Sequence, residues 1–330
     1  MLRYESMKKP LTAQQLLELS ATSPALEQFG LGSGAPYIAF NLRGSDPSLS
    51  DWLQHLPCPV IGIGDGALNA ACDVVLHNDK KLPVITRNIN AAPLAAMVLV
   101  QHLRASEKLS LANTLTAESF AYATVQNGPE FQKWLSGYQK QSLPTSNAPQ
   151  LLIESDNEVL SLTLNRSETR NSIGTDMRDA LFEALDIALV DDSFTKVKLT
   201  GNGATFSIGG AIEEFGEVSD PATAHWVRSL RLPALKLAQL SDKLNVHVNG
   251  AAIGAGAEIA AFGSYISASP KAWFQLPELK YGLIPGAGGT ASIPRRIGRQ
   301  KTAYMALSMG KITAKTALDW GLIDHVINED

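Results

Sequence analysis

The hydrophobic positions in the second half of the chain alternate between short apolar runs and helical stripes. A hairpin at 151–164 and a run at 197–200 are bounded by turn residues, which predicts strands. Between them, 176–190 has apolar residues at helical spacing with Thr175 as a candidate N-cap, and a second helical stripe covers about 222–240. Strands and helices in alternation predict an α/β fold.

The first half shows the same two patterns in separate blocks. A short helical segment and three strand-like runs come first, at 11–19, 37–40, 60–63 and 74–76. Helical patterns follow, at 90–106, at 109–125 and from Pro129 onward. The segment 140–150 has prolines and serines but few apolar residues, which predicts a linker. We therefore expect an N-terminal α/β segment at 1–139 that ends in helices, and a second α/β unit at 151–330.

A glycine motif in the first half suggests a nucleotide site but fits it poorly. Gly62, Gly64 and Ala67 match the pattern G-x-G-x-x-A, and Asp79 follows at a suitable distance. Only about six residues separate the motif from the next strand, whereas a crossover helix needs about a dozen. The spacing favours a plain turn over dinucleotide binding.

The segment 245–290 carries the most promising chemistry. A short strand at 246–248 leads into a run of small residues that opens a helix, where free N–H groups can bind developing negative charge. Glu258 lies one helical turn after Ala255, and Glu278 follows in a loop. A backbone anion site beside two carboxylates suits acid/base chemistry at a polarised carbonyl. A second glycine-rich turn, at 201–212, is also expected to lead into a helix.

Composition narrows the class of protein. With 45% hydrophobic and 18% charged residues the chain has the composition of an ordinary globular protein, and its net charge of -4 does not suggest nucleic-acid binding. No apolar run reaches the length of a membrane span, and no signal peptide is evident at the start. Cys58 and Cys72 are the only cysteines, and the six histidines lack metal-ligand spacing. We expect a cytoplasmic protein without a disulfide, a structural metal, or a nucleic-acid or membrane partner.

Several segments of the second half, in the right order, resemble the crotonase, or enoyl-CoA hydratase/isomerase, superfamily. They are 162–166 (LTLNR), 170–172 (RNS), 201–212, 248–250 (VNG), 254–258 (GAGAE), Pro277-Glu278 and 282–290 (GLIPGAGGT). The resemblance covers about 151–330 and implies a spiral core of ββα repeats. It also implies a coenzyme A thioester as substrate and no further cofactor.

The resemblance assigns roles to four residues. The backbone N–H groups of Gly210 and Ala255 would hold the thioester carbonyl and stabilise an enolate. Glu258 would act mainly as the base toward the water that adds at Cβ, and Glu278 as the main proton donor at Cα. Because many family members lack one of these glutamates, their joint presence favours hydration.

Further positions follow from the same resemblance. Those expected to contact the substrate or its coenzyme A are Arg170, Asn171, Ser207, Gly209 and Gly254. The chain departs from the family pattern at two positions: Ala211 stands where many members have Asp, and Ala255 replaces a frequent Gly. Only the backbone of Ala255 is needed, so its methyl group narrows the approach without removing the donor.

The largest departure concerns the family's C-terminal helices. The sequence runs only a little beyond 325–327, whereas family members usually continue with helices that complete the acyl pocket and subunit contacts. The pattern at about 90–138 looks like that tail, so we expect these helices to pack on the second half, in cis or on a neighbouring subunit. The family usually forms trimers or pairs of trimers, which predicts a homo-oligomer.

Three functions therefore stay open from the sequence. An enoyl-CoA hydratase-type lyase is favoured by the two glutamates. A Δ3,Δ2-enoyl-CoA isomerase or another crotonase-type reaction needs the same enolate. A non-catalytic acyl-CoA-binding or scaffold protein would explain the unusual first half, but not the two glutamates.

Overall fold

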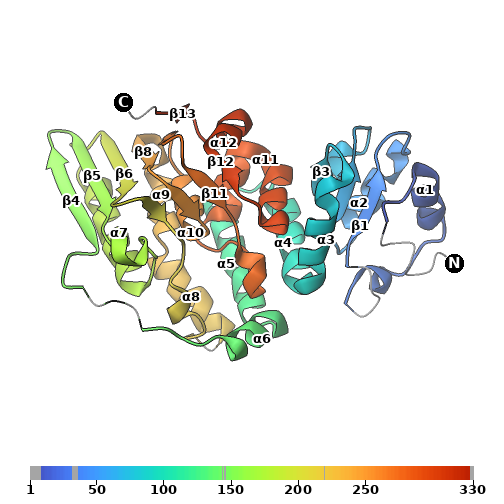
Figure 1. Cartoon of the computed structure of the whole chain (residues 1–330), viewed down its shortest axis with the longest axis horizontal. Coiled ribbons are helices and arrows are strands. Elements are labelled where there is room, and N and C mark those ends of the chain that lie inside the picture. Colours follow the sequence, from blue (N-terminus) through green and yellow to red (C-terminus); the bar gives the residue numbers. More distant parts are fainter. Residues whose placement is uncertain (1–8, 32–35, 143, 145, 219, 328–330) are drawn as a thin grey trace.

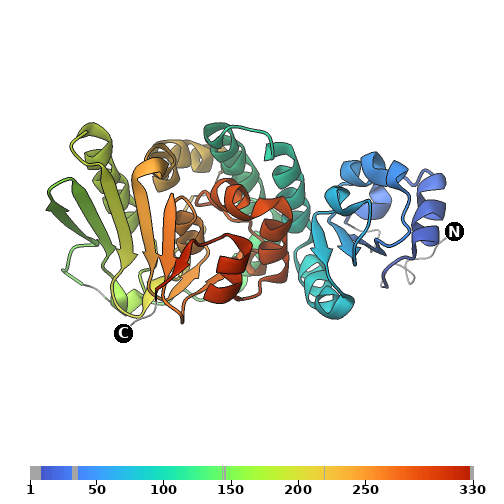
Figure 2. The same cartoon turned by 90° about the horizontal axis from the view of Figure 1, so that it is seen from above.

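The computed structural model describes residues 9–31, 36–142, 144, 146–218 and 220–327. The molecule is elongated, with a small N-terminal lobe at one end and a larger α/β unit at the other (Figure 1). Helices from the first half of the chain lie against α11 where the two parts meet (Figure 2). The expected α/β class is confirmed.

The N-terminal lobe is built on a three-stranded parallel sheet in the order β1-β2-β3. Its strands are β1 (Ile38–Asn41), β2 (Val60–Ile63) and β3 (Val74–Leu76), as the sequence predicts. Helix α1 (Ala13–Ala21) begins with a capping box at Thr12, and α2 (Ser50–His55) follows β1. Between β2 and β3 the chain forms only the 3-10 turn Asn69–Ala71, so the glycine motif opens no α-helix.

Four helices connect this lobe to the larger unit. They are α3 (Leu82–Ala91), α4 (Pro93–Ser106), α5 (Leu111–Gln126) and α6 (Pro129–Gly137). The predicted helix at 90–106 is wrong at its start, because Ala92 adopts a non-helical conformation (φ -141°) and Pro93 opens a new helix. The short helix α3 was not predicted.

Two sheets form the core of the second half. The larger has the order β13-β10-β8-β6-β5-β4, from strands β4 (Leu151–Asp156), β5 (Val159–Leu164), β6 (Lys196–Gly201), β8 (Leu244–Val248), β10 (Tyr265–Ala268) and β13 (His325–Val326). The smaller has the order β12-β11-β9-β7, from β7 (Thr205–Ser207), β9 (Ala251–Ile253), β11 (Trp273–Gln275) and β12 (Ile312–Thr313). Each of the successive pairs β6/β7, β8/β9 and β10/β11 gives one strand to each sheet, which is the expected ββ repeat.

The helices of this unit are α7 (Thr175–Val190), α8 (Pro221–Arg231), α9 (Pro233–Gln239), α10 (Ala255–Ala260), α11 (Gly289–Ser308) and α12 (Ala314–Trp320). The single helix predicted at 222–240 is wrong, because Pro233 lacks an N–H and the chain bends at Leu232. Thr175 does not cap α7, since its own N–H and hydroxyl donate to Glu214. The segment 201–212 contains β7 and leads into the 3-10 turn Ile212–Glu214, not into an α-helix as predicted.

The two halves share buried contacts. Helices α4 and α5 pack on α11, and α5 also packs on α8 and α9. The Asn88 side chain donates to the carbonyl oxygens of Leu307 and Ser308, each at 3.0 Å. Buried Asp73 pairs with Arg104 of α4 and with Arg299 of α11. The expected helical packing onto the second half is therefore present within one chain.

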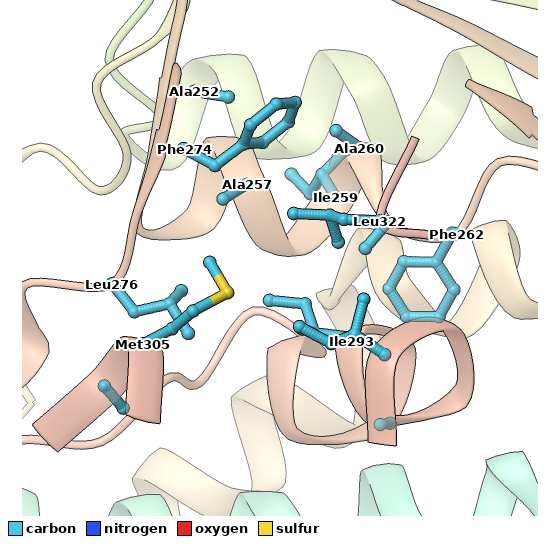
Figure 3. Packing of buried hydrophobic residues seen from close by; sticks show 14 of the residues in the cluster. Ala252, Ala257, Ile259, Ala260, Phe262, Phe274, Leu276, Ile293, Met305 and Leu322 are labelled. Atoms are coloured by element: carbon cyan, nitrogen blue, oxygen red, sulfur yellow. The ribbon is translucent and has the colours of Figure 1, made fainter. Parts of the chain in front are cut away.

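Helix α10, which carries the sequence motif, packs on buried apolar side chains. Ala257, Ile259 and Ala260 of α10 face Phe274 of β11 and Ile293 of α11, and all are buried (Figure 3). This packing fixes the orientation of α10 and hence of Glu258 on it.

Cys58 and Cys72 are buried and free. Among the described residues no single helix is long and apolar enough to cross a membrane, although the bent pair Asp79–Ala91 and Pro93–Ser106 reaches that limit by length and composition. No group of three or more His, Cys, Asp or Glu side chains in the described ranges is arranged to hold a metal ion.

Candidate active site

A cavity of about 310 Å³ opens between the two glycine-rich loops of the second half. Its lining includes Gly209, Gly210, Gly254 and Ala255 from these loops. Both predicted catalytic glutamates line it as well, together with side chains from α5 and α8. The structure thus brings six of the nine predicted site residues to one cavity.

Two backbone N–H groups at this cavity have no acceptor within the described part of the chain. Ile173 donates to the Gly209 carbonyl at 2.8 Å and accepts from Ala211 at 3.1 Å, which leaves the intervening Gly210 N–H unused. The Ala255 N–H begins α10 and likewise has no partner. Preorganised donors of this kind can stabilise an oxyanion.

Close contact between the two loops brings the donors together. A Cβ on Gly209 would lie 2.7 Å from the Ile253 carbonyl oxygen and 3.2 Å from the Ala255 nitrogen. Gly209 also has φ +90°, in the region that favours glycine. A larger residue would push the two loops apart, so a glycine is needed at position 209 to keep the two donors close together.

Glu258 is 2% exposed and held by backbone donors. Its Oε2 accepts from the N–H of Ala287 at 2.6 Å and of Gly289 at 2.8 Å. Burial, and then the nearby carboxylates of Glu278 and Glu118, raise the pKa of Glu258 well above its usual value, while the two N–H donors oppose the rise. A Cβ on Gly289 would lie 2.4 Å from the Glu258 Cγ, which explains the glycine there.

Glu278 starts the 3-10 turn Glu278–Tyr281. Its Oε2 is buried and has no hydrogen-bond partner among the described residues. Burial raises the pKa of Glu278 to about 8, so at neutral pH this carboxyl is largely protonated and can donate a proton. Its Oε1 sits against Gly254, where a Cβ would lie 2.6 Å away.

Three polar residues near the cavity were not predicted. Fully buried Glu118 of α5 accepts from the N–H groups of Gly288 and Thr290 and from the Thr290 hydroxyl. Arg228 of α8 donates to the Gly286 carbonyl and lies 3.9 Å from Glu118. Tyr122, one turn after Glu118, also lines the cavity.

A sequence signal for the α5 residues does exist. Leu111, Leu115, Glu118, Tyr122 and Val125 follow one another at helical spacing on α5. The carboxylate interrupts an otherwise apolar stripe, and a buried charge needs partners. The position of Glu118 in this stripe therefore predicts a buried polar contact on that face of α5, but it does not identify the partner residues.

Asn171 and Ser207, which were expected to contact the substrate or its coenzyme A, do not line the cavity. The Asn171 side chain, wholly buried, bonds the N–H of Arg166 and the carbonyls of Asn202 and Thr205. Ser207 donates to the Asn171 carbonyl at 2.7 Å and accepts from the Gly209 N–H at 3.1 Å. Both brace the loop of Gly209, and the geometry does not support a direct substrate contact.

Arg170 also lies outside the cavity lining. It is exposed, with a left-handed backbone conformation (φ +54°) at the end of the turn Ser167–Thr169. Its role as a contact to the phosphates of coenzyme A stays a prediction. Ala211, by contrast, is 3% exposed and lines the cavity.

Comparison with known proteins agrees with this geometry. Residues 154–330 match the family model described as enoyl-CoA hydratase/isomerase. The 2,3-dehydroadipyl-CoA hydratase of Escherichia coli K12 is 35% identical over 183 residues, which cover 55% of this chain and 70% of the relative. The 1,2-epoxyphenylacetyl-CoA isomerase of the same strain is 35% identical over 176 residues, 52% of this chain and 67% of the relative.

A solved structure shows the same fold. The crystal structure of an enoyl-CoA hydratase subunit I from Geobacillus kaustophilus HTA426 superposes with a TM-score of 0.51 at 26% identity. The match covers 56% of this chain and 70% of that structure. Because the family model matches residues 154–330, more than half of this chain, the chain belongs to the enoyl-CoA hydratase/isomerase family.

Proposed function

We propose that the protein is an enoyl-CoA hydratase-type lyase that adds water across the 2,3 double bond of an acyl-CoA thioester. The observation that carries the proposal is the meeting, at one cavity, of two buried glutamates and two backbone N–H groups that have no acceptor among the described residues. An oxyanion site alone would serve any reaction through an enolate. The pair of carboxylates supports the transfer of two protons, which hydration requires.

The thioester carbonyl accepts hydrogen bonds from the N–H groups of Gly210 and Ala255. These donors stabilise the enolate oxygen that develops when water attacks Cβ. Loss of one such donor typically costs about 2.7–4 kcal/mol of transition-state stabilisation. Since both are backbone groups on loops held against each other, they need little rearrangement during the reaction.

The two glutamates divide the proton transfers. Glu258 is assigned the role of the base that takes a proton from water, because two N–H donors hold its Oε2 and oppose the rise in its pKa that burial and the neighbouring carboxylates cause. Glu278, with a pKa of about 8 and no donor on Oε2, holds the proton that passes to Cα. The C–O bond forms at Cβ, the C–H bond forms at Cα, and the proton then returns from Glu258 to Glu278.

An isomerase is the second candidate within the family. A carboxylate that removes a proton from one carbon and returns it to another needs the same oxyanion site. The two relatives, a 2,3-dehydroadipyl-CoA hydratase and a 1,2-epoxyphenylacetyl-CoA isomerase, support a reaction of this family without selecting one. The second glutamate favours hydration, and product analysis separates the two.

The N-terminal helices belong to the proposal as well. We propose that α4, α5 and α6 take the place of the family's C-terminal helices, because α4 and α5 pack on α11 and α5 contributes Tyr122 and Gln126 to the cavity lining. The homo-oligomer, as a trimer or pair of trimers, and the cytoplasmic location stay predictions. Sedimentation of the purified chain would measure the oligomeric state.

The test is a direct assay of hydration. The loss of enoyl thioester absorbance is followed with crotonyl-CoA and with longer and aromatic 2-enoyl-CoAs, for the wild type, Glu258→Gln and Glu278→Gln. Each substitution is expected to slow turnover by about 10²–10⁴, the usual contribution of a general acid or base. Glu213→Gln, outside the cavity lining, is the matched control and should leave the rate unchanged.

Two results would overturn the proposal. Conversion of 3-enoyl-CoA to 2-enoyl-CoA without hydration would establish an isomerase. Binding of an acyl-CoA ester by calorimetry, without turnover of any enoyl-CoA, would establish the non-catalytic binding protein.

A further inference from the structure

Arg228 of α8 lines the cavity and uses few of its hydrogen-bond donors. Its side chain is only 16% exposed, and a guanidinium offers several N–H donors in a rigid plane. Nη2 donates to the Gly286 carbonyl. Nε is buried without a partner among the described residues, and Nη1 makes no hydrogen bond with any of them. Because a buried donor normally has an acceptor, the guanidinium has capacity for one that this part of the chain does not supply.

Two contacts hold the guanidinium in place. Its central carbon lies 4.3 Å from the centroid of the Tyr122 ring. The same ring lies against Gly286, where a Cβ would be 2.2 Å from the Tyr122 Cδ2. An arginine stacked on an aromatic face keeps the N–H groups at its edge available to other acceptors. The side chain is therefore oriented before any ligand arrives.

The ion pair of Arg228 with Glu118 does not use these donors. Nη2 lies 3.9 Å from Oε1 of Glu118, which is too long for a hydrogen bond. Glu118 already accepts from the N–H groups of Gly288 and Thr290 and from the Thr290 hydroxyl. The guanidinium thus stabilises this carboxylate by its charge alone.

Arg228 lies near the part of the site assigned to Cβ. Gly286, which accepts from Nη2, immediately precedes Ala287, and the Ala287 N–H holds the proposed base Glu258. An acyl chain that places Cβ beside Glu258 extends past it toward this wall. Apolar Leu232 and Ile259 line the same cavity and suit the methylene groups of such a chain.

The charges around Arg228 favour a neutral acceptor over an anionic one. Burial, and then neighbouring carboxylates that include Glu118, raise the pKa values of Glu258 and Glu278. A carboxylate on the substrate would add a further like charge to this group. A carbonyl or hydroxyl oxygen would accept from the guanidinium without adding charge.

We propose that Arg228 is a specificity-determining residue that donates a hydrogen bond to a neutral oxygen of the acyl group beyond Cβ. The substrate class is then a 2-enoyl-CoA with a carbonyl or hydroxyl oxygen on its chain, rather than one with a plain alkyl chain. The inference rests on the proposed function, because the place of Cβ follows from the roles given to the two glutamates.

The first measurement needs no variant. Hydration by the full chain is compared for 2-heptenoyl-CoA and its 6-oxo derivative, and for 2-octenoyl-CoA and its 7-oxo derivative. A ketone within reach of Arg228 should raise kcat/KM by about tenfold or more over the alkyl chain of the same length, the usual worth of a hydrogen bond to a charged group. The monothioester of 2-heptenedioic acid, which ends in a carboxylate, should gain nothing over 2-heptenoyl-CoA.

Arg228→Lys tests the residue itself. Lysine keeps the positive charge near Glu118 but replaces the planar guanidinium with a single ammonium group. The preference for the ketone should be lost, while the alkyl chains react at nearly the wild-type rate. Arg231→Lys is the matched control, because Arg231 is on the same helix, pairs with Glu183 at the surface and lies outside the cavity lining. It should leave the preference intact.

Three results would overturn the inference: equal rates for ketone and alkyl chains at both positions, a preference for the terminal carboxylate, or equal slowing of all substrates by Arg228→Lys, which would assign a structural role. Calorimetry with the saturated heptanoyl and octanoyl thioesters and their 6-oxo and 7-oxo derivatives separates the inference from the proposed function. Tighter binding of a ketone that Arg228→Lys abolishes, without hydration of any enoyl-CoA, would refute the hydratase and support the role of Arg228. Hydration without any preference for a ketone would refute this inference alone.

Discussion

Glu118 and Thr290 lie 172 residues apart in the sequence and are joined by two hydrogen bonds, at 2.9 Å to the Thr290 N–H and 2.6 Å to its hydroxyl. The contact fastens α5 to the start of α11. In the loop that leads into α11, the N–H groups of Ala287 and Gly289 donate hydrogen bonds to Glu258. One carboxylate from the first half thus holds the loop that orients the proposed base of the second.

Glu118→Gln should destabilise the fold. The amide keeps one acceptor oxygen but turns an NH₂ group toward backbone donors, and an unsatisfied buried polar group costs about 1–3 kcal/mol. The midpoint of chemical denaturation should fall accordingly. Glu183→Gln, which removes an exposed ion pair with Arg231, is the control and should change stability by less than about 1 kcal/mol. Equal midpoints for the two variants would contradict the proposed anchor.

The stability of the protein should depend on the ionisation of Glu278. Its pKa rises from 4.5 to about 8 in the folded chain, so between these values the folded state binds more protons than the unfolded state. The free energy of unfolding should therefore decrease as pH rises from 4.5 to 8. Glu278→Gln should flatten this decrease and be more stable than the wild type at pH 8. Parallel curves for the two proteins would show that Glu278 ionises normally.

The ionisation of Glu278 should also determine how the rate of hydration depends on pH. If protonated Glu278 supplies the proton at Cα, kcat/KM for hydration falls as pH rises through about 8. The measurement is a pH–rate profile with crotonyl-CoA. A rate that is constant from pH 7 to pH 9 would remove Glu278 as the proton donor.

Gly254→Ala should abolish most activity. The new Cβ would lie 2.6 Å from Oε1 of Glu278, and the backbone at φ +49° disfavours a side chain. We expect turnover to fall at least tenfold as the carboxylate is displaced. Gly64→Ala, at φ +86° with open space around it, imposes similar backbone strain away from the site and should retain activity once folded. Full activity of Gly254→Ala would contradict the described approach of Glu278.

A chain restricted to residues 150–330 should not form an active enzyme. Without α4 and α5, the faces of α8, α9 and α11 that they cover would be exposed to water. We expect aggregation or loss of cooperative unfolding, measured by light scattering and circular dichroism. A monodisperse, fully active fragment would show that the first half is dispensable.

The local parts of the site could be predicted from the sequence. The strand before Asn249, the small residues before Glu258 and the turn at Glu278 are set by neighbours in the chain. Local reasoning failed where a distant partner decides the structure. Thr175 looks like an N-cap, but Glu214 accepts its N–H and hydroxyl, so it donates rather than caps.

The contacts that the first half of the chain makes at the site could not be predicted from local sequence patterns. The stripe on α5 shows that Glu118 faces a core, yet nothing in its spacing identifies Gly288 and Thr290 as donors. Likewise, Asn171 and Ser207 belong to motif segments, but their bonds to backbone groups show that they brace a loop. A motif records that a residue is needed and leaves open whether it touches the ligand.

The long separation of Glu118 from Thr290 also sets an order of events during synthesis. At about 5–20 residues per second, α5 leaves the ribosome on the order of ten seconds or more before its partners in the loop and α11 exist. During that interval its buried face has no cover, and the nascent helices resemble an aggregation-prone intermediate. The yield of active protein in a cell should therefore depend on holding chaperones, more than for a chain whose cavity is built from neighbouring segments.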